Sequence, residues 1–118
     1  MRLAIVGSTR LAGHPEAKRI IKAIIEKYKP DVVVSGGAKG IDSMAAAQAR
    51  ALGIEVLEFK PQKQQWNGPG GFKERNEAIA NNCDRLIRIV AVDTTTYGSG
   101  WTRDRAEDHG IPTEQFFI

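Results

Sequence analysis

The sequence predicts an α/β fold in which helices cover both faces of a parallel sheet. Short apolar runs alternate along the chain with segments whose apolar residues recur every three or four positions, the pattern of β-α-β units. The 118 residues suit one domain spanning 1–118, and they contain neither repeats nor a linker-like stretch. Because crossovers between parallel strands are right-handed, we expect a Rossmann-like three-layer α/β/α sandwich with strand order 3-2-1-4-5.

Five strands and four helices account for the chain in this interpretation. The expected strands are residues 3–6, 32–34, 54–59, 85–92 and 113–118, and the expected helices are residues 17–28, 43–52, 72–82 and 101–109.

The first strand is an apolar run that ends at Gly7. In the helix that follows, apolar residues recur at intervals of three and four up to Tyr28, with Pro15 suited to its first turn and Pro30 just beyond its end. The second strand is apolar throughout, as expected of a strand that helices cover on both faces.

The second helix is rich in alanine, which permits close packing on a sheet, and it ends at Gly53. A polar loop with glycine and proline, residues 60–71, separates the third strand from the third helix. The fourth strand is followed by a predicted loop over residues 93–100, which precedes the last helix and strand.

Composition argues against a disordered chain, a disulfide-linked or metal-binding protein, and a membrane protein. Apolar residues make up 42% of the chain and charged residues 26%, which is ordinary for a folded domain, and the net charge of +3 suits a phosphate or nucleic-acid ligand without identifying one. The single cysteine, Cys83, excludes an internal disulfide, and the two histidines have no metal-ligand spacing, so we expect no metal and no required cofactor. No apolar run approaches the ~20 residues of a membrane span, which favours a cytoplasmic protein without membrane contact.

The loop after the second strand, residues 35–43, carries more glycine than a tight turn requires. Glycines let a backbone approach a ligand, and the next helix offers free N–H groups to an anion. Either Asp42 or Ser43 is expected to cap that helix. A plain turn is the alternative, but we favour phosphate binding by Gly36, Gly37, Lys39, Gly40 and Asp42.

Two polar residues interrupt the inward face of the third helix. Phe72 and Ile79 define that face, and Arg75 and Asn76 lie on it. Burying an arginine and an asparagine is costly unless they have partners. A buried polar network is one explanation, and recognition of a ligand is the one we favour, because local rules fail most often at sites.

Other candidate residues follow the first and fourth strands. They are Gly7, Ser8 and Arg10 after the first strand, and Gly98, Ser99, Gly100 and Thr102 after the fourth. All these segments lie at carboxyl ends of strands, where ligands bind in open α/β sheets. Trp101 and Trp66 lie in or beside these loops, where each could stack on a base or pack its own loop down.

In this order, the segments resemble the SLOG superfamily, which includes the DNA-processing protein DprA/Smf, the "lonely guy" phosphoribohydrolases and small YspA-like domains. The resemblance runs through residues 36–42, 46–53, 75–76, 83–84 and 98–106, and the short chain is most similar to the YspA-like group. It implies a Rossmann-like domain, often a homodimer, that binds nucleotides or nucleotide-derived ligands.

The chain departs from the phosphoribohydrolases where they carry the motif PGGxGTxxE. Arg105 stands three residues after Thr102, where the glutamate would be, and Asp104 is the nearest carboxylate. We therefore expect a sensor or binding module for a nucleotide-like small molecule. One alternative is a nucleotide N-glycosidase that uses Asp42 or Asp104 in place of the glutamate, and another is a binder of single-stranded nucleic acid. Because Arg105 stands where the glutamate would be, we expect glycosidase turnover to be weak or absent.

Overall fold

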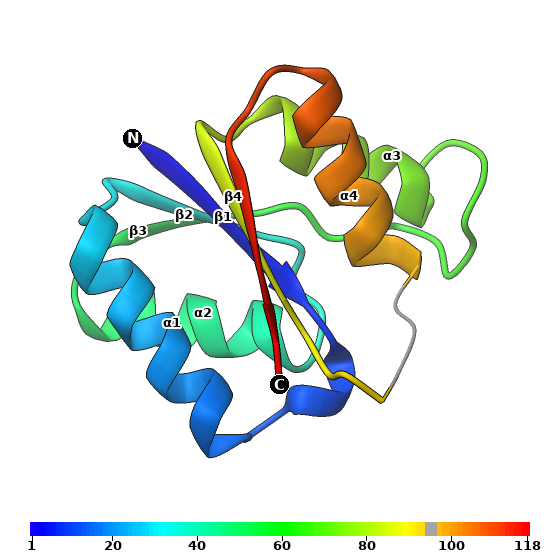
Figure 1. Ribbon diagram of the computed structural model, residues 1–118. Coiled ribbons are helices and arrows are strands. Elements are labelled where there is room, and N and C mark those ends of the chain that lie inside the picture. The colour runs from blue at the N-terminus through cyan, green and yellow to red at the C-terminus, as the bar shows by residue number, and fades with distance from the viewer. Residues whose placement is uncertain (94–96) are drawn as a thin grey trace.

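The computed structural model describes residues 1–93 and 97–118, and their strands form one parallel sheet in the order β3-β2-β1-β4-β5 (Figure 1). This confirms the predicted fold and strand order. The strands are β1 (Arg2–Gly7), β2 (Val32–Ser35), β3 (Glu55–Glu58), β4 (Arg85–Val90) and β5 (Thr113–Phe117). The helices are α1 (Pro15–Tyr28), α2 (Ile41–Ala51), α3 (Phe72–Asn81) and α4 (Tyr97–Asp108), with a 3-10 turn, η1 (Thr9–Leu11), after β1.

Helices α1 and α2 cover one face of the sheet, and α3 and α4 cover the other (Figure 1). Side chains alternate along a strand, so β1 serves both layers: Leu3 and Ile5 pack in the cluster under α1 and α2, and Ala4 and Val6 pack in the cluster under α3 and α4. Every one of these four residues is buried, which explains the unbroken apolar run. No helix among the described residues is long and apolar enough to cross a membrane.

The strand order reverses at the centre of the sheet, between β1 and β4. β1 pairs with β2 on one side and with β4 on the other, so the segments leaving β1 and β4 diverge. In open α/β sheets, the crevice at this switch point is where ligands bind. Ser8 ties the two strand ends together, because its N–H donates to the Ile89 carbonyl at 3.0 Å and its Oγ accepts from the Ala91 N–H at 3.1 Å.

Two helix starts differ from the prediction. α2 begins at Ile41 with Gly40 as its N-cap and no capping side chain, so the expected cap by Asp42 or Ser43 is wrong. α4 begins at Tyr97, which places Gly98, Ser99 and Gly100 in its first turns rather than in a loop. Glycine has low helix propensity, and packing overrode it here. Residues 94–96 of the predicted loop lie outside the described residues.

The cysteine is buried, as predicted. Cys83 follows the end of α3 and packs in the same cluster as Ile79, and burial raises the pKa of its thiol to about 11.

Candidate ligand-binding site

A cavity of about 220 Å³, called the inner cavity below, lies at the carboxyl edge of the sheet beside the switch point. It is lined by the end of β1, the loop before α2, the first turns of α3 and the first turns of α4. Seven of the residues predicted separately from the sequence meet there: Gly7, Asp42, Arg75, Asn76, Gly98, Ser99 and Thr102.

A second cavity of about 510 Å³, the outer cavity, adjoins the first and shares Thr9, Ala38 and Arg75 with it. Gly36, Gly37 and Phe72 are among its other lining residues. Lys39, Lys60 and Arg75 contribute three cations, and no carboxylate is found among the described residues that line it.

Lys60 is a site residue that the sequence interpretation missed. It follows β3 at the same edge of the sheet as the glycine loop, its side chain is 70% exposed, and its Nζ lies 3.6 Å from Glu58 Oε2. A lysine at the carboxyl end of the third strand was the signal available.

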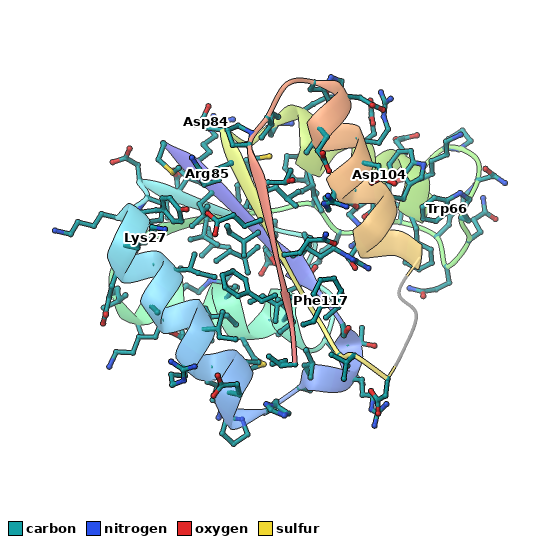
Figure 2. All side chains as sticks on the ribbon, viewed as in Figure 1. Lys27, Trp66, Asp84, Arg85, Asp104 and Phe117 are labelled. Carbon is teal, nitrogen blue, oxygen red and sulfur yellow. The ribbon has the colours of Figure 1, made fainter. Side chains whose placement is uncertain are left out.

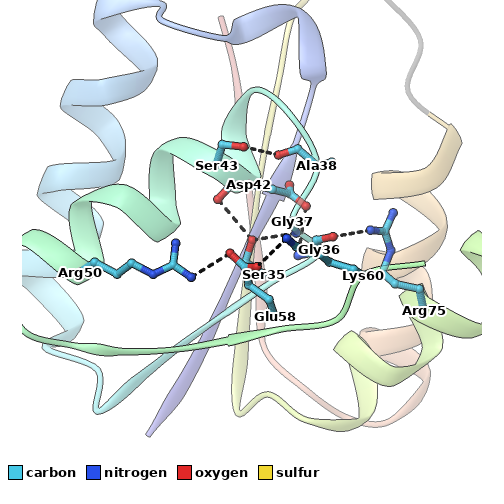
Figure 3. Close-up of polar contacts among 10 residues, drawn as sticks. All are labelled: Ser35, Gly36, Gly37, Ala38, Asp42, Ser43, Arg50, Glu58, Lys60 and Arg75. Atoms are coloured by element: carbon cyan, nitrogen blue, oxygen red, sulfur yellow. Dashed lines mark hydrogen bonds and ion pairs between the residues drawn. The ribbon is translucent and has the colours of Figure 1, made fainter. Parts of the chain in front are cut away.

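Asp42 lies behind the glycine loop with its carboxylate turned toward the backbone of that loop (Figure 3). The Gly36 N–H donates to Asp42 Oδ2 at 3.1 Å. Burial raises the pKa of Asp42 from its ordinary value of 3.8 to about 6, against the opposing effects of Arg75 and of backbone N–H groups of Gly36, Ala38 and Gly7. The amides expected to hold a phosphate thus surround a carboxylate of the protein itself.

N–H groups in the first turn of α2 are also hydrogen-bonded within the protein. The Ile41 N–H donates to the Ser8 carbonyl at 3.4 Å, and the Ser43 N–H donates to the Ala38 carbonyl at 3.1 Å. The Ser43 hydroxyl donates to the same carbonyl at 2.6 Å (Figure 3). These bonds use N–H groups that a bare helix N-terminus would offer to an anion.

Arg75 connects α3 to the glycine loop. Its Nη1 donates to the Gly36 carbonyl at 2.6 Å (Figure 3). Its Nε donates to Asn76 Oδ1 at 2.6 Å, and the guanidinium lies 5.6 Å from the centre of the Phe72 ring. Asn76 is buried and donates from Nδ2 to the Gly98 carbonyl at 3.4 Å. The buried polar network considered as an alternative is therefore present, and Arg75 is not an unpaired cation, although its side chain borders both cavities.

Polar contacts also fix the first turns of α4. Thr102 is buried and its Oγ1 donates to the Gly98 carbonyl at 2.8 Å. Arg88 on β4 donates from Nε to Ser99 Oγ at 3.0 Å and from Nη1 to Gln115 Oε1 at 2.6 Å. The sequence interpretation missed Arg88, although a charged residue inside an apolar strand is the same kind of signal that identified Arg75.

Several predicted residues lie elsewhere. Arg10 forms an ion pair with Asp93 at 2.6 Å and lines neither cavity. Gly40 packs against the backbone at Ser8 and Thr9, with a φ of 82°, so its glycine is required by the fold. Gly100 faces Arg88 from α4 and borders neither cavity.

The two tryptophans pack against each other. Trp66 lies in the loop before α3 (Figure 2). Its ring meets that of Trp101 on α4 edge to face, with ring centres 5.5 Å apart. This geometry favours the packing interpretation over an open platform for a base, because each ring already has an aromatic partner.

The carboxylate and arginine that mark the departure from the phosphoribohydrolases face away from the inner cavity. Asp104 has a side chain 72% exposed on the surface of α4 (Figure 2), where it lies 3.8 Å from Arg103. Arg105 forms a two-armed ion pair with Glu77 on α3, with both contacts at 2.8 Å. Residues 1–93 and 97–118 contain no cluster of three or more histidine, cysteine or acidic side chains that could hold a metal ion.

Together, the fold and the cavities define a Rossmann-like α/β protein with a basic cleft at the switch point of its sheet. The X-ray structure of DNA processing protein A (DprA) from Streptococcus pneumoniae has the same fold, with a TM-score of 0.74 and 23% sequence identity. The match covers 97% of this chain and 49% of that chain, so this protein spans about half the length of its structural neighbour. No protein-family model matches the chain, and no curated protein sequence does.

Proposed function

We propose that the protein is a binding module for a nucleotide or nucleotide-derived ligand, which it holds in the paired cavities at the carboxyl edge of the sheet. The observation that carries this proposal is the outer cavity, which is lined by Lys39, Lys60 and Arg75 and by no carboxylate of the described residues. Three cations in a concave site suit the charge of a phosphate group.

The geometry changes which groups would hold the phosphate. The sequence favoured the loop amides, but those amides face Asp42, and two N–H groups of the first turn of α2 are bonded within the protein. The cationic side chains of the outer cavity are better placed to bind the phosphate. Phe72 lines the same cavity and offers an apolar ring to a base.

Membership of the SLOG superfamily, and of its YspA-like group, is part of this proposal. It is supported by the fold shared with DprA and by the position of residues 36–42, which bring their glycines and Asp42 to the switch point.

Calorimetric titration with the four ribonucleoside 5′-monophosphates tests the proposal. Arg75→Ala should weaken binding by about 1.5–3 kcal/mol, roughly tenfold to hundred-fold, because a hydrogen bond to a charged group is lost. Arg75→Lys should recover little, since an ammonium does not reproduce the planar guanidinium. Because Arg75 also supports Gly36, we expect Arg75→Ala to lower stability, so binding is measured well below its melting temperature.

Arg19→Ala is the matched control, because Arg19 is an exposed arginine on α1, far from both cavities. It should bind like the wild-type protein. The proposal is contradicted if no monophosphate binds to the wild type, or if Arg75→Ala, still folded, binds each of them equally well.

Single-stranded nucleic acid is the second candidate ligand. One solved structure with this fold is of a DNA processing protein, and the outer cavity combines cations with an aromatic ring, as single-strand sites do. The affinity for an oligonucleotide that bridges several cations should fall steeply between about 50 mM and about 200 mM salt, whereas that of a monophosphate should fall much less. An oligonucleotide that binds more tightly than every monophosphate, with this steep dependence, would favour the second candidate.

Cleavage of an N-glycosidic bond is expected to be weak or absent. Where the phosphoribohydrolases carry their glutamate, this chain has Arg105, which is paired with Glu77, and Asp104 is exposed on the surface of α4. Asp42 lines the inner cavity, but backbone N–H groups and Arg75 already surround its carboxylate. Incubation with the monophosphates, followed by chromatography for free base, measures this. Turnover on the order of 1 s⁻¹ would contradict the expectation.

A further inference from the structure

We infer that Asp42 makes the inner cavity a sugar site, in which its carboxylate accepts hydrogen bonds from ribose hydroxyls and selects ribonucleotides over deoxyribonucleotides. The inference rests on the proposed function, because it assigns the inner cavity to the sugar of the same ligand. It is carried by the contacts of Asp42 and by the lining and size of the cavity.

The inner cavity disfavours an anion. The backbone N–H groups that would attract a phosphate point at the Asp42 carboxylate, which already occupies their centre. Asp42 is only 5% exposed and borders the cavity, so a phosphate there would meet a like charge at a site shielded from water. Like charges repel strongly in such surroundings.

The rest of the lining of the inner cavity suits a sugar. Asp42 offers acceptor oxygens, and Arg75 offers a polar edge, while Val6 and Ile79 supply an apolar surface for the carbon face of the ring. An acidic residue that accepts from a ribose hydroxyl is a recurrent means of nucleotide recognition in folds with this sheet architecture. The 2′-hydroxyl is the group by which a protein distinguishes ribose from deoxyribose.

The size of the inner cavity limits what it can hold. At about 220 Å³ the inner cavity is smaller than the roughly 300–1,000 Å³ of pockets that enclose whole drug-sized ligands. It therefore takes one part of a nucleotide. Arg75 and Thr9 border both cavities, so a sugar in the inner one leaves the phosphate facing the cations of the outer one.

The test compares each ribonucleoside 5′-monophosphate with its 2′-deoxy counterpart by calorimetric titration of the wild-type protein. The deoxy ligand should bind roughly tenfold to hundred-fold more weakly, the factor for losing a hydrogen bond to a charged group. Asp42→Asn should bring the ratio of the two dissociation constants close to one. Asp31→Asn is the control and should keep the wild-type ratio, because Asp31 is an exposed aspartate just before β2, at the opposite edge of the sheet.

A measurement on the wild type covers the case in which Asp42→Asn does not fold. The ratio of dissociation constants is determined at about pH 7.5 and about pH 5, on either side of the titration of Asp42. Among the described residues, the charged group that faces Asp42 is Arg75 on α3, and the contacts from the end of β1 and the loop after β2 are backbone N–H groups. Both ligands carry the same phosphate, so its own titration cancels, and the ratio should shrink at the lower pH.

The outcomes separate this inference from the proposed function. If ribo- and deoxyribonucleotides bind the wild type equally well, or if a folded Asp42→Asn protein keeps the preference, Asp42 does not select the sugar, although the cleft still binds nucleotides. If neither ligand binds, the proposed function itself is wrong, and the inference falls with it.

Discussion

Gly36 is constrained by space rather than by its backbone angles. A Cβ atom there would lie 2.7 Å from both Asp42 Oδ2 and Arg75 Nη1, and neither group is free to withdraw, because each also bonds to the Gly36 backbone. The glycine loop is therefore required by the Asp42–Arg75 arrangement of the protein. The sequence interpretation identified these glycines but attributed the need for them to the close approach of a ligand.

Gly36→Ala should lower the free energy of unfolding by about 1–3 kcal/mol, the usual cost of overpacking. Chemical denaturation measures it. Gly98→Ala is the control, since a Cβ there meets Asn76 Nδ2 at an ordinary 3.5 Å and the residue is helical, which should leave stability equal or higher. Equal stability of Gly36→Ala and wild type would contradict the close packing described for this loop.

The ionisation of Asp42 should make stability depend on pH. Its pKa in the folded chain is about 6, raised by burial from an ordinary 3.8, so the folded state binds the proton more tightly than the unfolded state. The contribution is fully present below about pH 4 and is lost as the pH rises through about 6. At about 1.4 kcal/mol for each pH unit, the full effect is about 3 kcal/mol.

Asp42→Asn isolates this contribution from those of the other carboxylates, which both proteins share. The stability of Asp42→Asn relative to wild type should be greater at about pH 7.5 than at about pH 4, by up to about 3 kcal/mol. Denaturation curves at several pH values give the difference. A difference that is constant across this range would show that Asp42 is not a buried carboxylate with a raised pKa.

At the scale of elements, the loop of residues 60–71 is fastened to α4 by its tryptophan. Trp66 meets Trp101 edge to face, and the Trp66 carbonyl accepts from the Lys73 N–H at 3.0 Å, so the loop is tied to both α3 and α4. This loop forms part of the wall of the outer cavity through Lys60 and Gln64.

A double-mutant cycle of Trp66→Ala and Trp101→Ala should give a coupling free energy of about 0.5–1.5 kcal/mol, as expected for an edge-to-face aromatic pair. The control cycle pairs Trp66→Ala with Leu52→Ala, because Leu52 is an exposed residue at the end of α2 on the other face of the sheet, and its effects should add. Additive effects in both cycles would mean that the ring contact does not hold the loop.

Elements were predictable from the sequence where apolar periodicity carried the signal. The stripe of α1 and the unbroken apolar runs of β1 and β2 follow directly from burial on both faces of the sheet. The start of α4 was missed, because Gly98 and Gly100 are poor helix formers and only packing shows that they are helical. The sequence predicted that the site residues lie at the carboxyl ends of the strands. That the Asp42 carboxylate accepts hydrogen bonds from the loop amides could not be predicted, because the spacing of residues does not give the direction of a side chain.

For the whole molecule, the homodimer expected from the family resemblance remains a prediction. Light scattering at about 100 μM, well above the dissociation constant of a specific interface, should give twice the mass of one chain. A monomer mass at this concentration would contradict it.

The central claim is that the carboxyl edge of the sheet, between β1 and β4, is the ligand-binding edge. Nuclear magnetic resonance of ¹⁵N-labelled protein, titrated with ribonucleoside 5′-monophosphates, tests it most directly, because each backbone N–H reports its own surroundings. Saturable shifts are expected at Thr9, Ala38, Asn76 and Thr102, which line the cavities, and none at Asp31 and Asp84, at the opposite edge. The absence of saturable shifts, or shifts that gather at the opposite edge, would contradict the claim.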